Sequence, residues 1–147
     1  MKIALTVCVV VACLSPALVA AQQYVCLNDG DSIQSSGGAN WEAAAIPSGA
    51  LAFSLTSELR GHRTFEADIF ISGDRERLAN CERWDPNRGF GQCSNEREGI
   101  QILLHRSKET GHMNFILHAR EQGLDRLGLK YRIRTESLVI KGTCQLQ

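Results

Sequence analysis

The chain has 147 residues, with 16 Lys and Arg against 16 Asp and Glu, so its formal net charge is zero. This balance argues against binding to a phosphate backbone through net charge alone, and leaves only local charged patches open. The length is typical of one domain with a hydrophobic core.

Residues 1–21 have the pattern of a secretory signal peptide: a basic Lys2, a short apolar run, and small residues before the polar Gln22. A membrane helix is the alternative, but Pro16 interrupts the run and no basic stop-transfer cluster follows it. We expect cleavage after Ala21, with Ala20 as the alternative. Residues 22–147 would then form a single secreted, β-rich domain.

Four cysteines follow the leader: Cys26, Cys81, Cys93 and Cys144. An even number in a secreted chain predicts two disulfides, with three pairings open. We favour Cys81–Cys93, which are close in sequence, and Cys26–Cys144, which joins the two ends. The longer loop should contribute roughly 4–5 kcal/mol against ~3 for the shorter one. A zinc site is the rival interpretation, but the scattered spacing without Cys-x-x-Cys argues against it.

The N-terminal half predicts turns, one short helix and two strands. Residues 22–40 start extended and continue as loop. Residues 40–45 are good helix formers behind an Asn N-cap, bounded by Pro47, which predicts a helix of at most two turns. Apolar residues alternate with polar ones over residues 50–57 and 63–71, which predicts a strand in each.

In the C-terminal half, residues 80–99 contain one Pro and several Gly, and we predict a loop restrained by the Cys81–Cys93 bridge. Residues 99–120 predict a β-hairpin with a polar loop over 107–111. Residues 121–128 predict a loop or one helical turn. Residues 129–134 and 137–141 alternate as strands do.

The second arm of the hairpin shows the clearest period of two. One face carries Met113, Phe115, Leu117 and Ala119, and the other carries His112, Asn114, Ile116, His118 and Arg120. Together these elements predict a mainly β fold: a single antiparallel β-barrel or sandwich with at most one short helix and two disulfides.

Histidines at 105, 112 and 118 share one predicted face with Arg120. Imidazole beside guanidinium suits phosphoryl transfer, with His118 or His105 as general acid, a carboxylate such as Glu98 or Glu66 as base and Arg120 holding the phosphate. The interpretation that we favour is an ordinary wetted sheet face, since any exposed strand shows this spacing. We expect no metal site or other cofactor, because no His-x-His or Glu-x-x-His pair is present.

Two aromatic residues, Trp84 and Phe90, fall in the stapled loop together with Arg83 and Arg88. Exposed aromatics on a rigid loop suit contact with a protein or a sugar, so these four residues are the predicted binding site. The alternative is that both aromatic side chains fold back to cover the core.

The two ends of the domain, Tyr24-Val25-Cys26 and Gly142-Thr143-Cys144, resemble those of the ribonuclease-like effectors among the small secreted cysteine-stapled proteins of plant-associated fungi. That resemblance implies a fold like the guanyl-specific fungal ribonucleases, usually without the active site. The chain departs from the group in its second cysteine pair and in having no three-turn helix after Cys26.

A second resemblance is to the Alternaria-major-allergen-like family of secreted β-barrels. The sequence Phe70-Ile71-Ser72-Gly73 precedes a cysteine, and the short Cys81–Cys93 loop and alternating strands follow. This resemblance implies an all-β barrel. Neither family provides a functional residue that can be transferred to this chain.

We therefore expect a secreted, extracellular, effector-like interaction protein without enzymatic activity. It would bind a host or extracellular partner, either a protein or a glycan, through the stapled loop and a sheet face. We expect no binding to a membrane. One alternative is a secreted ribonuclease-like hydrolase. A nucleic-acid partner is expected only under this alternative. The other is a carbohydrate-binding domain that uses Trp84 and Phe90.

Overall fold

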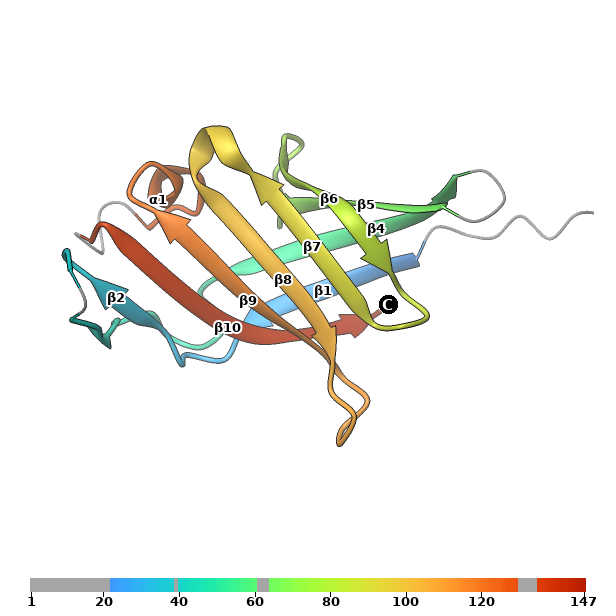
Figure 1. Ribbon diagram of the computed structural model, residues 1–147, viewed down its shortest axis with the longest axis horizontal. Helices are drawn as coiled ribbons and strands as arrows, with labels where there is room; N and C mark the ends of the chain where they lie inside the picture. The colour runs from blue at the N-terminus through green and yellow to red at the C-terminus, as the bar shows by residue number, and fades with distance from the viewer. Residues whose placement is uncertain (1–21, 39, 61–63, 130–134) are drawn as a thin grey trace, which may run out of the picture.

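The computed structural model describes residues 22–38, 40–60, 64–129 and 135–147. The predicted signal peptide and, apart from Leu129, the predicted strand over 129–134 lie outside these residues. Within them, antiparallel strands form a closed barrel (Figure 1) with the following members: β1 (Gln22–Asn28), β4 (Ala52–Arg60), β5 (Thr64–Ile71), β6 (Arg77–Asp85), β7 (Phe90–Asn95), β8 (Ile100–Arg106), β9 (Met113–Arg120) and β10 (Ser137–Leu146).

Barrel closure depends on β1, which pairs with β4 on one side and with the end of β10 on the other. The first and the last strand of the described residues are therefore neighbours in the barrel. The predicted fold class, a mainly β antiparallel barrel with one short helix and two disulfides, is confirmed.

Both predicted disulfides are confirmed. Cys26–Cys144 joins β1 to β10, and Cys81–Cys93 joins β6 to β7; in each case the two cysteines are direct partners in the strand register. All four side chains are buried. The first bridge thus locks the first strand to the last, and two buried disulfides indicate an oxidising compartment.

The interior is filled by alternate side chains of the strands. Phe53 and Phe115 meet edge to face at the centre, with ring centroids 4.7 Å apart. Gly142 faces this pair, and a Cβ there would collide with the Leu27 carbonyl oxygen and the Phe115 ring. The barrel therefore has a packed core at this level.

The hairpin predicted over residues 99–120 is confirmed as β8 and β9, with Met113, Phe115, Leu117 and Ala119 buried as expected. The helical turn expected within residues 121–128 is α1 (Gly123–Arg126). Together with η1 (Glu96–Glu98), α1 lies at the end of the barrel where β8 begins and β9 ends. Leu124 and Leu127 are buried there.

The predicted loop over residues 80–99 is wrong for most of its length. The chain forms β6 and β7, joined by a turn at 86–89, so the Cys81–Cys93 bridge crosses a β-hairpin. A β-bulge between Cys81 and Arg83 shifts the alternation, so that Cys81 and Trp84 both point inward although three positions apart. The bulge conceals the period of two that identifies a strand.

The helix predicted over residues 40–45 is also wrong. Here β3 (Glu42–Ala43) pairs with β2 (Ile33–Ser35), which continues the sheet beside the start of β10. Ala44 and Ile46 are both buried, and only an extended segment directs residues two apart to the same side. Tertiary burial overrides the helix propensity of the alanines.

No helix among the described residues has both the length and the apolar character needed to cross a membrane.

Candidate interaction surface

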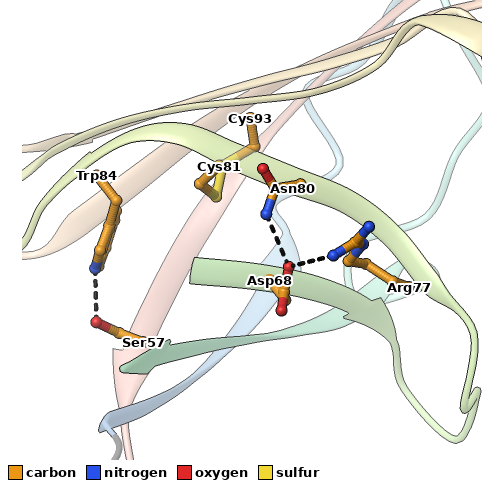
Figure 2. The surroundings of a disulfide bond; sticks show 7 residues. All are labelled: Ser57, Asp68, Arg77, Asn80, Cys81, Trp84 and Cys93. Atoms are coloured by element: carbon orange, nitrogen blue, oxygen red, sulfur yellow. Dashed lines mark hydrogen bonds and ion pairs between the residues drawn. A yellow bond between two sulfur atoms is a disulfide. The ribbon is translucent and has the colours of Figure 1, made fainter. Parts of the chain in front are cut away.

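Trp84 lies inside the barrel, which corrects its assignment as a contact residue. Its side chain is 6% exposed, and its indole Nε1 donates a hydrogen bond of 2.6 Å to Oγ of Ser57 on β4 (Figure 2). The ring also meets Tyr24 edge to face at 6.0 Å. Gly91 lies against the indole, where a Cβ would come within 2.7 Å of the ring. Trp84 is thus a core residue that joins β6 to β4.

The other three predicted contact residues are on the surface. Phe90 is 44% exposed at the start of β7, and Arg83 and Arg88 are exposed near it. Arg88 forms a loose ion pair with Asp85 across the turn, at 3.5 Å. Because Arg83 is the strand partner of Gln92, it lies diagonally from Phe90 on the outer face.

The position of Phe90 is fixed by a contact between two turns. The Arg106 guanidinium donates hydrogen bonds to the carbonyl oxygens of Pro86 and Gly111, which ties the β6–β7 turn to the β8–β9 loop. Gly89 rests on Arg106 with φ +66°, leaving no space for a side chain. This end of the hairpin is therefore restrained at both the turn and the disulfide.

Phe90 begins an apolar stripe on the outer wall of the barrel. The stripe takes one residue from each of five adjacent strands, in spatial order β7, β8, β9, β10 and β2: Phe90, Leu103, Ile116, Val139 and Ile33. Phe90, Leu103 and Ile33 are 44%, 45% and 40% exposed, and the other two are half-buried.

The strand register makes the stripe continuous. Leu103 is directly opposite Ile116, and Val139 is directly opposite Ile33. Phe90 lies diagonally from Leu103, and Ile116 lies diagonally from Val139. With strands about 4.8 Å apart and residues rising about 3.3 Å, the stripe is roughly 20–25 Å long. Figure 1 shows β7, β8, β9 and β10 side by side across this wall.

The outward positions of β7 to β10, all of them described, hold no Asp or Glu. Three stripe residues have a basic cross-strand neighbour: Phe90 is opposite His105, Ile116 is opposite Lys141, and Val139 is opposite His118. The remaining outward positions are these: Gln92, Ser94, Gln101, Asn114, Arg120, Ser137, Thr143 and Gln145. This wall is thus apolar at its centre, and on β7 to β10 the positions around the stripe are basic or neutral. At the Phe90 end, the strand partner on β6 is Asp85, whose carboxylate is paired with Arg88.

The wall formed by β4 and β5 has the opposite character. A shallow hollow of about 200 Å³ is lined there by Thr56, Glu58, Glu66, Asp68 and Phe70. One Asp68 carboxylate oxygen accepts hydrogen bonds from Arg77 at 3.2 Å and from Asn80 at 3.0 Å, both on β6 (Figure 2). The β4–β5 wall is therefore acidic, and one of its carboxylates is held by neighbouring side chains.

The proposed catalytic residues do not form one group: His118 and Arg120 lie two positions apart on the outer face of β9, but His105 and Glu98 lie elsewhere. His105 is opposite Asn114 and His118 is opposite Gln101, so the two histidines lie four positions apart along the sheet, or about 13 Å. An acid–base pair on one small substrate must come much closer. The Glu98 carboxylate lies 3.3 Å from Nε of Arg126, so it belongs to a different group of charges.

That group surrounds Arg126 at the α1 end of the barrel. Its guanidinium contacts Asp74 at 2.9 Å, Glu98 at 3.3 Å and Glu76 at 3.7 Å, while its side chain is 20% exposed. Burial acts to lower the pKa of Arg126, but the hydrogen bond to Asp74 and the charges of Glu76 and Glu98 outweigh it and raise that pKa. The pKa of Asp74 is lowered by the Glu76 backbone N–H and by Arg126. Arg126 thereby ties α1 to the β5–β6 turn and to η1.

No group of three or more His, Cys, Asp or Glu side chains among the described residues is placed to hold a metal ion. Comparison of the chain with family models, with curated proteins and with solved structures gave no match.

Proposed function

We propose that this chain is a secreted, effector-like interaction protein that binds an extracellular or host protein through the apolar stripe. The observation that carries the proposal is the stripe itself, an unbroken apolar line across five strands of the outer wall. Contiguous exposed apolar surface of this kind is typical of interaction sites. The buried disulfides and the predicted signal peptide support export to an oxidising compartment.

The stripe is not needed to fill the core. The inward positions of the same strands already supply large buried side chains, such as Ile102, Leu104 and Leu117. Leu103 and Ile116 point the opposite way, and cross-strand pairs of polar β-formers such as Thr would serve the sheet as well. Their apolar character therefore favours a contact outside the molecule, at a cost of leaving apolar area in water.

The proposed site overlaps the binding site predicted from the sequence but is centred on the sheet face instead of the stapled loop. Phe90 stays at one end of the stripe, with Arg83 beside it, while Trp84 leaves the site because it is buried. The sheet face that was expected to assist the loop becomes the main surface. The loop itself contributes the end of that surface.

The test is an affinity capture of partner proteins from the extracellular fluid into which the protein is released. The wild type and two double variants, all oxidised and mature, are the baits. Leu103→Gln with Ile116→Gln removes the centre of the stripe, and Thr56→Gln with Phe70→Gln makes a matched change on the acidic wall. We expect a protein bound by the wild type to be lost from the stripe variant and kept by the control. Equal binding by both variants would contradict the proposal.

A further inference from the structure

We infer that the partner's docking surface is an acidic amphipathic protein segment, with apolar side chains bordered by Asp and Glu. This inference rests on the proposed function and specifies the chemistry of the partner at the same stripe. Three observations carry it: the placement of basic groups, the absence of carboxylates from the outward positions of β7 to β10, and the length of the stripe.

The basic groups are distributed along the stripe rather than gathered at one end. His105, Lys141 and His118 are direct cross-strand neighbours of Phe90, Ile116 and Val139. Directly opposed residues have Cβ atoms about 5 Å apart, so a group placed over the stripe lies within reach of these side chains. The ammonium donates charged hydrogen bonds, and an imidazole has at least one N–H to donate. Carboxylates are the complementary groups.

A second copy of this chain fits the stripe poorly. Two stripes packed face to face would bring the lysine and histidine side chains of both copies together, without an outward carboxylate on β7 to β10 to offset them. The acidic wall around Glu58 and Asp68 offers Phe70 as the one aromatic residue lining its hollow. It is therefore not a matching apolar surface for a stripe of five residues.

The length of the stripe suits a short helix. At 1.5 Å per residue, an α-helix of about 15 residues spans the roughly 20–25 Å between Phe90 and Ile33. An amphipathic helix presents apolar residues at every third or fourth position, with flanking positions free for acidic residues. Such a segment would place apolar side chains on the stripe and carboxylates toward Lys141 and the two imidazoles.

The probes are two synthetic amphipathic helical peptides of about 16 residues with identical apolar faces, one flanked by Glu and the other by Lys. Their binding to the full oxidised protein is measured by fluorescence anisotropy at low and high salt. We expect the Glu-flanked peptide to bind about tenfold more tightly, and salt to reduce that difference. His105→Glu with Lys141→Glu should reverse the preference, and Ser54→Glu with Thr56→Glu on the other wall should preserve it.

The outcomes separate this inference from the proposed function. The wild type could bind both peptides equally, and Leu103→Gln with Ile116→Gln could abolish the binding of both. In that case the inference of an acidic partner is wrong, and the stripe is still the docking surface. Binding of both peptides that survives the stripe variant contradicts the proposed function itself. Vesicles of phosphatidylserine and phosphatidylcholine form a third arm. Stripe-dependent binding to these vesicles, without a peptide preference, would identify a lipid surface and overturn the inference.

Discussion

The β4–β5 wall and the β7–β10 wall of the barrel are both built from antiparallel strands, but they differ in the side chains that they expose to solvent. On the β4–β5 wall, polar side chains form hydrogen bonds with one another and with the neighbouring strand. Asp68, for example, accepts hydrogen bonds from Arg77 and Asn80 of β6. On the β7–β10 wall, the outward-facing side chains of Leu103 and Ile116 are direct cross-strand partners and are both apolar. Inward positions on both walls are dictated by the core. The outward positions do not have to fill the core, so the difference in outward side chains between the two walls bears on function.

The largest expected effect comes from removing a side chain from the core of the barrel, beneath the outer walls. Trp84→Ala removes a buried indole that packs on Tyr24 and bonds to Ser57, and we expect a loss of about 3–5 kcal/mol in the free energy of unfolding. Urea denaturation measures it. Phe90→Ala, an exposed aromatic on the same hairpin, should change stability by less than about 0.5 kcal/mol. Equal losses in the two variants would contradict this division between core and surface.

The second prediction concerns binding rather than stability. Replacing Leu103 and Ile116 by Gln should weaken the complex with the partner by about 2–4 kcal/mol, since central apolar contacts dominate interfaces. The urea midpoint should change little, because both side chains point outward. Titration calorimetry with the captured partner gives the affinity. A variant that binds normally, or one that fails to fold, would refute this assignment.

A smaller effect is expected at the α1 end of the barrel. Arg126→Met should lower the free energy of unfolding by about 1 kcal/mol at neutral pH, because three carboxylates lose their shared cation. Denaturation of wild type and variant side by side measures the difference. Lys108→Met, on the exposed β8–β9 loop, is a control that should be close to neutral.

The Arg126 effect should also depend on pH. The pKa of Asp74 in the folded state lies below its ordinary value of 3.8, so its ionisation stabilises the fold above that value. This stabilisation is lost as the pH falls through the lowered pKa. The difference between wild type and Arg126→Met should therefore be complete near neutrality and shrink in acid below 3.8. A difference that grows in acid would have the wrong sign.

The smallest effect is expected on the acidic wall. Asp68→Asn keeps the shape of the side chain and removes its charge, while Arg77 and Asn80 still find an amide oxygen. Because Arg77 is more than half exposed, we expect less than about 1 kcal/mol in unfolding experiments. Binding to the partner should stay as in the wild type. A clear loss of binding would move the interaction surface to this wall.

The sequence predicted those parts of the fold in which alternation is uninterrupted. The arm from Met113 to Arg120 has an apolar residue at every second position from Met113 to Ala119, and the predicted burial of that face is confirmed. Alternation alone does not predict the hairpin of β6 and β7, because a bulge follows Cys81 and the small Gly91 makes room for Trp84. Local propensity predicts a helix over residues 40–45, because it carries no information on the pairing of this segment with β2.

The stripe could not be predicted because it exists only between strands. In the sequence, Ile116 is an apolar exception on a polar face, and Leu103 is hidden in an apolar run between Ile102 and Leu104. The adjacency of Leu103 and Ile116 requires the register of β8 against β9, and that of Val139 and Ile33 requires the pairing of β10 with β2, which is distant in sequence. Of the four predicted contact residues, only Phe90 lies in the stripe itself.

Site-specific photo-crosslinking measures whether the apolar stripe contacts the partner protein. The photoreactive residue p-benzoylphenylalanine is placed at position 103 in the stripe or at position 56 on the acidic wall, and each protein is irradiated in the extracellular fluid that receives it. We expect a covalent adduct with a partner protein from position 103 and none from position 56. Adducts from position 56 alone, or equally from both, would show that the stripe is not the docking surface.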